Sequence, residues 1–192
     1  MPETLNIDVA QIPQTTTDFQ DLRHLLATYV RTTCAKTIVE IGTDVGDSAR
    51  IFSGILQETQ GVLYTIDLQP PKGNWLTTWP IKNIFFLQGD FKSMVWGQVV
   101  DLVFIDGDHS YEGCLADLQK FGPWVRVGGY VLLHDTLHSE FGPGIMKAIW
   151  GWTTETRYPL VHYPYQHGFA AIEITHELPR MPVVVAGGTR PG

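Results

Sequence analysis

The sequence has 192 residues, of which 44% are hydrophobic and 17% charged, so it can bury one good core but is short for two independent domains. Thirteen Lys and Arg against twenty Asp and Glu give a net charge of −7, and the scattered basic residues argue against a surface that tracks nucleic-acid phosphates. The sequence carries neither a signal-peptide pattern nor an apolar run that could cross a bilayer. We therefore expect a single soluble, cytoplasmic domain over residues 1–192 that acts on a small molecule and binds neither nucleic acid nor membrane.

The chain alternates between segments with helical and with strand-like patterns. Apolar residues at helical spacing predict a helix over residues 17–32, within an N-terminal helical segment at 1–35. Further helices are expected at residues 47–59, 111–121 and 144–152, and strands at 37–42, 61–67, 83–90, 101–106 and 128–135. Residues 158–165 and 169–174 are expected to form a closing pair of strands, residues 69–80 a loop, and residues 186–192 a frayed tail. Apolar strands separated by helices predict an α/β fold, with a mostly parallel sheet covered on both faces.

Polar residues gather where the predicted strands end. They are Glu40 to Gly46, Asp67, Asp90, Asp106 to His109, and His134 to Thr136. In an open α/β sheet, ligands bind beyond the carboxyl ends of the strands, so the set predicts one acidic binding edge. The alternative for each acid alone is that it solvates a strand end or caps the next helix.

The first of these loops, residues 40–48, has the form Glu-x-Gly-x-x-x-Gly-x-Ser between a strand and a helix. A Walker loop requires a lysine, and this loop has none. The spacing of Gly42, Gly46 and the next glycine, Gly54, does not fit a dinucleotide fingerprint. Asp44 and Asp47 lie inside the loop and would repel a pyrophosphate. A ligand with positive charge and no phosphate suits this loop better.

Two further acids match parts of a nucleoside. Asp67 ends the second strand, 25 residues after Gly42, where a carboxylate can accept both hydroxyls of a ribose. Asp90 ends the third strand and is placed to meet an adenine edge.

These motifs resemble the class I S-adenosylmethionine-dependent methyltransferases. Within that class, "FIDGDHSYEGCLADLQKF" and "VGGYVLLHDT" are similar to the small O-methyltransferase group that includes macrocin-type and cephamycin-biosynthesis-type enzymes. The resemblance covers roughly residues 35–140. It implies a Rossmann-like sheet of seven strands, with the last strand antiparallel.

The resemblance also implies roles for the strand ends. Gly42 and Gly46 would lie along the methionine part of the cofactor, Glu40 would orient its amino group, Asp67 would hold the ribose and Asp90 the adenine. The full set of implied cofactor contacts is Glu40, Gly42, Thr43, Gly46, Ser48, Asp67, Asp90 and Asp106.

A divalent cation is the second expected ligand. If the strands that end at Asp106 and Asp135 are neighbours, the two carboxylates can share one ion, for which Mg²⁺, Ca²⁺ and Mn²⁺ are suitable. Metal-dependent relatives add a third Asp, Glu or Asn, but here Asp135 is flanked by His134 and Thr136. We assign His134 as the third candidate ligand, while a base or a packed side chain stays an alternative for it.

A general base is also needed to deprotonate an alcohol, and Asp108 and His109 directly follow Asp106. The structural alternatives are a turn residue that caps the next helix, for Asp108, and a packed loop histidine, for His109. We expect an O-methyltransferase that acts on a small-molecule hydroxyl, with an acceptor site that is either open or completed by a second copy in a homodimer. The competing classes are a nucleotide-cofactor oxidoreductase and a non-catalytic module that binds S-adenosylmethionine or a metal.

Overall fold

The computed structural model describes residues 19–78, 82–138, 140, 142–165 and 167–180. The predicted tail at 186–192 and the first 18 residues of the predicted N-terminal segment lie outside the described residues.

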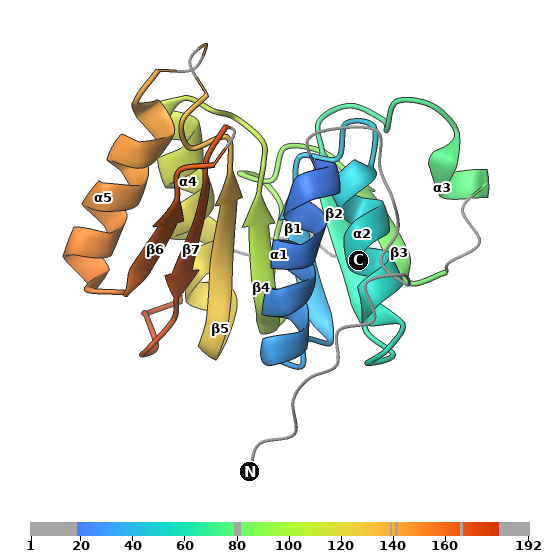
Figure 1. The fold of residues 1–192 in the computed structure, drawn as a ribbon, viewed down its shortest axis with the longest axis horizontal. Coiled ribbons are helices and arrows are strands. Elements are labelled where there is room, and N and C mark those ends of the chain that lie inside the picture. The colour runs from blue at the N-terminus through green and yellow to red at the C-terminus, as the bar shows by residue number, and fades with distance from the viewer. Residues whose placement is uncertain (1–18, 79–81, 139, 141, 166, 181–192) are drawn as a thin grey trace, which may run out of the picture.

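A seven-stranded sheet forms the centre of the molecule (Figure 1). Its strands, in spatial order, are β3 (Ile84–Gln88), β2 (Val62–Asp67), β1 (Thr37–Ile41), β4 (Val100–Ile105), β5 (Val125–His134), β7 (Phe169–Glu173) and β6 (Leu160–Tyr163). The pairs from β3 to β5 are parallel, and β7 runs antiparallel to both β5 and β6. The predicted α/β fold with an antiparallel last strand is therefore confirmed.

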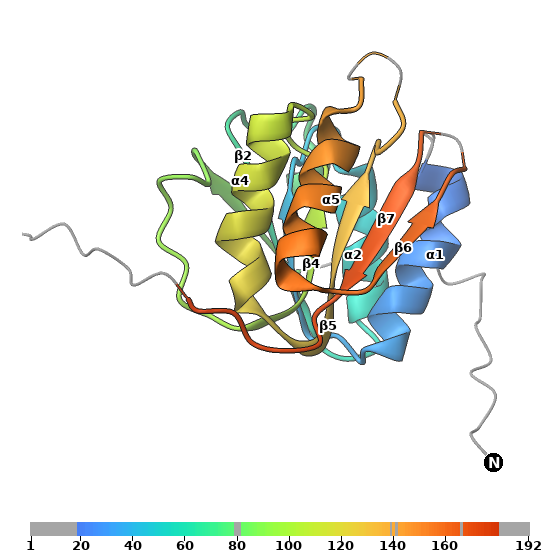
Figure 2. The same cartoon turned by 90° about the vertical axis from the view of Figure 1, so that its left-hand side faces the viewer.

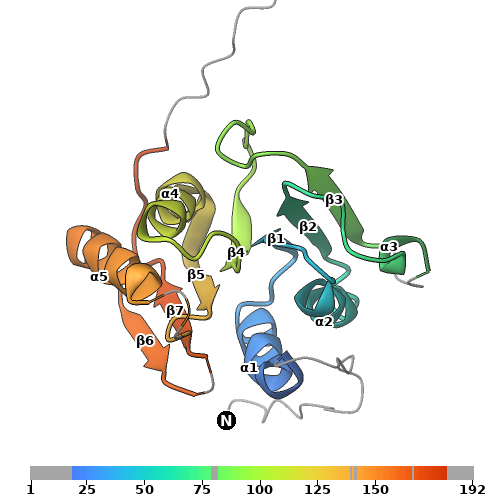
Figure 3. The ribbon, with the colours of Figure 1, turned by 90° about the horizontal axis from the view of Figure 1, so that it is seen from above.

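Helices cover both faces of the sheet, as Figure 3 shows from above. On one face lie α1 (Phe19–Thr32) and α2 (Asp47–Leu56), and on the other α4 (Tyr111–Phe121) and α5 (Gly144–Thr156). The short α3 (Trp75–Thr78) lies in the predicted loop, and a 3₁₀ turn at Gly122–Trp124 leads into β5. Among the described residues, no helix is both long and apolar enough to cross a membrane.

The side chains of β4 alternate between two cores. Leu102 and Phe104 pack with residues of α1 and α2, whereas Val103 and Ile105 pack with residues of α4 and α5. A strand that is buried on both faces must be apolar throughout, which is why it reads as a continuous hydrophobic run in the sequence.

Three element boundaries differ from expectation by three residues or more, and the first is the end of α2 at Leu56 instead of 59. β5 begins at Val125 instead of 128, because the strand continues through Gly128 and Gly129 with a register shift opposite the start of β4. A Cβ at Gly129 would overlap the carbonyl oxygen of Asp101, so the glycine allows close approach of the two strands. α5 continues beyond 152 to Thr156, beside α4 (Figure 2).

The amino ends of three strands are joined through Asp101 of β4. One carboxylate oxygen accepts hydrogen bonds from the backbone of Lys36 (2.7 Å) and Thr37 (2.8 Å), at the start of β1. The other accepts a hydrogen bond from the guanidinium of Arg126 (2.6 Å), at the start of β5. This polar cluster lies at the opposite edge of the sheet from the strand ends considered next.

Candidate active site at the carboxyl ends of the strands

The parallel strands end at the same level, so the predicted site residues share one edge of the sheet. Ile105 of β4 is in register with both Ile41 of β1 and Leu133 of β5. The residues that follow these positions therefore emerge side by side. The expectation that the strands ending at Asp106 and Asp135 are neighbours is confirmed.

The glycine loop after β1 packs directly against the end of β4. Gly42 has a φ of 95°, which is open to glycine but strained for other residues. A Cβ there would also overlap the carbonyl oxygen of Asp106. Gly46, with a φ of 76°, is the N-cap of α2 and donates its N–H to the carbonyl oxygen of Thr43 (2.7 Å). The two glycines thus allow this loop to turn and to contact the loop that follows β4.

Asp67 at the end of β2 holds this loop in place. One of its oxygens accepts backbone N–H groups of Thr43 (2.9 Å) and Asp44 (3.2 Å), and the other accepts that of Gln69 (3.0 Å). A carboxylate has about four acceptor positions, so it retains capacity for a ligand hydroxyl. Beside it, Asp44 forms an ion pair with Lys72.

Glu40 lies fully buried beneath the glycine loop. Burial raises the pKa of its carboxyl to about 8, with Asp106 and Asp67 adding to the rise, although hydrogen bonds from Ser48 and Thr65 oppose it. Oε1 accepts the hydroxyl of Ser48, and Oε2 has no hydrogen-bond partner among the described residues. A buried acceptor of this kind suits a cationic or N–H-bearing ligand.

Asp90 is exposed after β3. Its carboxylate accepts the N–H of Lys92 (2.9 Å) and its carbonyl oxygen accepts that of Ser93 (3.0 Å), so it forms a turn. This turn lies on the same edge as Asp67, because Asp67 and Gln88 are in register.

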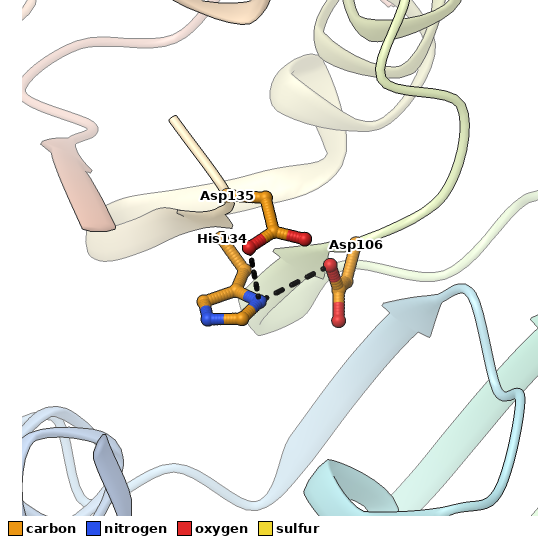
Figure 4. A group of neighbouring side chains, drawn as sticks. All are labelled: Asp106, His134 and Asp135. Carbon is orange, nitrogen blue, oxygen red and sulfur yellow. Dashed lines mark ion pairs between the residues drawn. The ribbon is translucent and has the colours of Figure 1, made fainter. Parts of the chain in front are cut away.

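At the ends of β4 and β5, Asp106, His134 and Asp135 form a compact cluster (Figure 4). Each offers a ligand atom that lies within 4.8 Å of the others. Nδ1 of His134 lies 3.4 Å from Oδ1 of Asp106 and 3.5 Å from Oδ1 of Asp135. Burial alone would raise the pKa of Asp106, but interactions with His109 and His134 lower it to about 2. Asp106 is therefore ionised at neutral pH, and the cluster has the donor chemistry of a metal site.

The two candidate bases differ in whether their side chains reach the cluster: His109 does, and Asp108 forms a turn instead. Nε2 of His109 lies 3.4 Å from Oδ1 of Asp106 and 3.6 Å from Oδ2 of Asp135, so its ring reaches the cluster. Asp108 instead accepts the N–H of Ser110 (2.9 Å), a bond that lowers its pKa. Its side chain also packs against Gly113, where a Cβ would overlap it. The structure thus shows the predicted turn geometry at Asp108, while its role as a base stays a prediction.

One buried acid near this edge escaped the sequence interpretation. Asp117 of α4 is fully buried, and neither carboxylate oxygen has a hydrogen-bond donor among the described residues. Burial raises its pKa to about 8; Lys92 opposes the rise, and Asp108 and Asp90 add to it. The sequence does indicate that this acid is buried, because Asp117 lies at helical spacing from the apolar Cys114 and Phe121 and therefore on the same face of α4.

Comparison with known proteins identifies the family. The profile of a family described as "Methyltransferase domain" matches residues 39–136. A curated protein of Sinorhizobium fredii, the uncharacterized protein y4gI, is 36% identical over 73 residues, which are 38% of this chain but only 8% of that protein.

Solved structures share the fold at low sequence identity. An O-methyltransferase from Bacillus cereus in complex with SAH is 16% identical, with a TM-score of 0.67 and 86% of each chain covered. The O-methyltransferase TomG from Streptomyces achromogenes, involved in tomaymycin synthesis and solved with SAM, is 18% identical, with a TM-score of 0.63 and coverage of 82% of this chain and 81% of TomG. The matched profile spans just over half of the 192 residues and includes every strand end described above; the chain belongs to this methyltransferase domain family.

Proposed function

We propose that this protein transfers the methyl group of S-adenosylmethionine to an oxygen of a small-molecule acceptor, with the assistance of a divalent cation. One observation carries the proposal: Gly42 brings an acidic, lysine-free glycine loop into backbone contact with the residue that begins the Asp and His cluster. A cofactor loop and a candidate metal site therefore adjoin each other at one edge of the sheet.

The residues around the loop fit this cofactor. S-adenosylmethionine supplies an electrophilic methyl group on a cationic sulfonium, and it has an amino group, a ribose and an adenine, all of which acids can bind. Glu40 has a free acceptor oxygen under the loop, Asp67 retains about one acceptor position for a ribose hydroxyl, and Asp90 is exposed toward solvent for the adenine. Thr43, Gly46 and Ser48 complete the set of proposed contacts.

The cluster fits a divalent cation, which would be held by Asp106, His134 and Asp135. A bound cation lowers the pKa of an acceptor hydroxyl and orients it for attack. The protein's own contribution is to place the two ligand sites side by side, since proximity supplies much of the acceleration of a bimolecular transfer. Asp108 and His109 are the proposed bases for the hydroxyl proton, and His109 is the nearer to the cluster.

The two structural neighbours agree with this class of reaction. Both are called O-methyltransferases, one was solved with SAH and the other with SAM, and TomG is said to act in the synthesis of tomaymycin. A small-molecule hydroxyl as acceptor is our extension of these descriptions to this chain.

Calorimetry and thermal unfolding test the proposal directly. S-adenosylmethionine and S-adenosylhomocysteine should each bind and raise the unfolding midpoint, since a ligand at 100 times its Kd stabilises the folded state by about 2.7 kcal/mol. Asp67→Asn should weaken both about 10- to 100-fold, because charged hydrogen bonds to the ribose are lost. Glu155→Gln, which alters an exposed carboxyl on α5, is the matched control and should bind as the wild type does.

The same experiment discriminates between the alternatives. Binding of NAD(H) without either sulfur cofactor would indicate an oxidoreductase. Binding of S-adenosylmethionine with no turnover of any hydroxyl acceptor in a broad screen would indicate a non-catalytic module. If neither sulfur cofactor binds, the proposed function is wrong.

A further inference from the structure

We propose that the cluster of Asp106, His134 and Asp135 selects a first-row transition metal ion, such as Zn²⁺, Mn²⁺ or Fe²⁺, over Mg²⁺. The inference rests on the proposed function only for the use of the ion in catalysis. The metal preference itself depends on the donor atoms of the three side chains.

The two separations that join His134 to the carboxylates are those of ligands around one ion. The contacts of His134 with the two carboxylates, 3.4 and 3.5 Å, are longer than the roughly 2.7–2.9 Å of a charge-assisted hydrogen bond. Two donors that are each about 2.1 Å from one ion, at a tetrahedral angle, stand about 3.4 Å apart. The imidazole of His134 thus lies at ligand spacing from both carboxylates.

The type of donor favours a transition metal. Mg²⁺ prefers an octahedral shell of oxygen atoms, whereas imidazole nitrogen suits Zn²⁺ and Fe²⁺ and raises affinity along the first-row series. Only the ring of His134 supplies nitrogen within the three-residue cluster. His109 places a second imidazole nitrogen 3.4 and 3.6 Å from the same two carboxylates, so a bound ion would have further nitrogen close by.

The imidazole of His134 is held in place by the sheet. It is the last residue of β5, is in register with Phe169 of β7, and is only 6% exposed. Its ring lies against Phe104, with ring centroids 6.5 Å apart. A buried ring packed against Phe104 has little freedom to turn away from Asp106 and Asp135, so an ion shared by the two carboxylates would lie beside this nitrogen.

The neighbouring sulfur is an unsuitable donor. Cys114 lines a small pocket together with His109 and His134. Its sulfur is not among the ligand atoms that lie within 4.8 Å of one another at the cluster. The expected donor set is therefore nitrogen and oxygen without sulfur.

Metal titration of the full chain, after removal of bound ions with EDTA, tests the inference. By calorimetry we expect Zn²⁺ to bind at least 100-fold more tightly than Mg²⁺. Co²⁺ should give the intense visible absorption of a low-coordinate site with nitrogen donors, and Zn²⁺ should displace it. Both readouts are independent of enzyme activity.

Two variants identify the responsible residue. His134→Asn should weaken Zn²⁺ binding at least 10-fold and leave Mg²⁺ affinity within about 3-fold, since only the nitrogen donor is lost. His176→Asn is the matched control: this exposed histidine follows β7, at the opposite edge of the sheet, and its removal should leave both affinities unchanged.

Equal affinity of the wild type for Zn²⁺ and Mg²⁺, or unchanged Zn²⁺ binding in a folded His134→Asn variant, would overturn the inference. If circular dichroism shows that this variant is unfolded, the Co²⁺ spectrum of the wild type decides instead, and the weak absorption of an all-oxygen octahedral site would overturn it. S-adenosylhomocysteine binding to the wild type is measured separately, so that the two proposals can fail independently. If the wild type does not bind S-adenosylhomocysteine, the proposed function is contradicted but the metal preference is not.

Discussion

Glu40 and Asp117 lie beneath the binding edge as buried carboxyl groups with unused acceptor oxygens. Burial raises the pKa of each to about 8, so both are mostly protonated at pH 7. The pKa of Asp106, close to Glu40, is lowered to about 2, since its histidine neighbours outweigh the effect of burial. Neighbouring acids therefore carry different charges, which decide what each can bind.

Cofactor binding should release a proton from Glu40. A cationic amino group beside this carboxyl would lower its pKa from about 8, so at pH 7 up to about one proton should leave for each cofactor bound. Calorimetry in Tris and in phosphate measures this release, because the two buffers differ in ionisation enthalpy. Glu40→Gln should give the same heat in both buffers, and equal heats for the wild type would contradict the prediction.

Asp117 should make the folded state less stable as pH rises. Below pH 3.8 the carboxyl is protonated in both states; between 3.8 and about 8 the unfolded chain loses a proton that the folded chain keeps. The free energy of unfolding should therefore fall by up to about 1.4 kcal/mol for each pH unit in this range. Glu40 contributes with the same sign, and the lowered pKa of Asp106 matters only below about pH 4.

Urea unfolding of Asp117→Asn between pH 5 and 8 checks this effect. The variant should show a shallower pH dependence than the wild type, whereas Glu155→Gln, at an exposed position, should follow the wild type. Parallel pH profiles for the wild type and Asp117→Asn would show that Asp117 does not titrate as described.

At the scale of single elements, β4 has functionally different polar residues at its two ends. Asp106, the first residue of the candidate metal site, directly follows its carboxyl end, and its amino end supplies Asp101, which joins the starts of β1 and β5. Arg126 extends this connection to the carbonyl oxygen of Thr33 after α1 (2.6 Å). The strand therefore separates a stabilising edge from a binding edge.

Asp101→Ala should destabilise the fold and leave ligand binding intact. The change leaves two backbone N–H groups and a guanidinium without their acceptor, so we expect the free energy of unfolding to fall by about 2–4 kcal/mol. Glu58→Gln removes the charge of an exposed carboxylate that pairs with Arg31 but keeps an acceptor oxygen, and it should cost less than about 1 kcal/mol. A 10-fold loss of S-adenosylhomocysteine affinity in Asp101→Ala would contradict the separation of the two edges.

At the scale of the whole molecule, one sheet divides two hydrophobic cores. Phe104 lies fully buried in the core under α1 and α2, where its ring packs edge-on against Phe52 (5.3 Å between centroids). Trp152 lies in the other core, beside Tyr158. Because every strand from β1 to β5 contributes to the sheet between them, we expect the two cores to unfold together.

Phe104→Ala tests this cooperativity. Loss of the ring should cost about 3–5 kcal/mol and lower the urea midpoint. Far-ultraviolet circular dichroism and tryptophan fluorescence should shift by the same amount, although Trp96 and Trp152, two of the six tryptophans, pack in the core on the other side of the sheet. Separate midpoints for the two signals would show that the cores unfold independently.

The sequence predicted the architecture because its evidence is local. Apolar strands and amphipathic helices appear as periodic patterns, and the rule that ligands bind at the carboxyl ends of strands placed the acids at one edge. The predicted start of β5 at residue 128 was wrong, because Gly128 and Gly129 look like a strand boundary whereas the strand continues through them.

The finer features of the site depend on packing between distant segments. The contact between Gly42 and Asp106, and the bonds from Asp67 to Thr43, arise from strand register and loop geometry that no short window of sequence specifies. The turn at Asp108 was an open alternative that only its contacts with Ser110 and Gly113 could reveal. The assignments of cofactor, metal and base residues remain predictions.

The register of β4 and β5 has a further consequence for ligand binding. Since Ile105 and Leu133 are partners, the two backbones fix the separation of Asp106 and His134 before any ligand arrives. Most of the conformational entropy needed to gather these donors is therefore lost during folding instead of during binding. The candidate metal site is preorganised by the sheet, and its affinity should depend on the strength of the donors more than on the cost of assembling them.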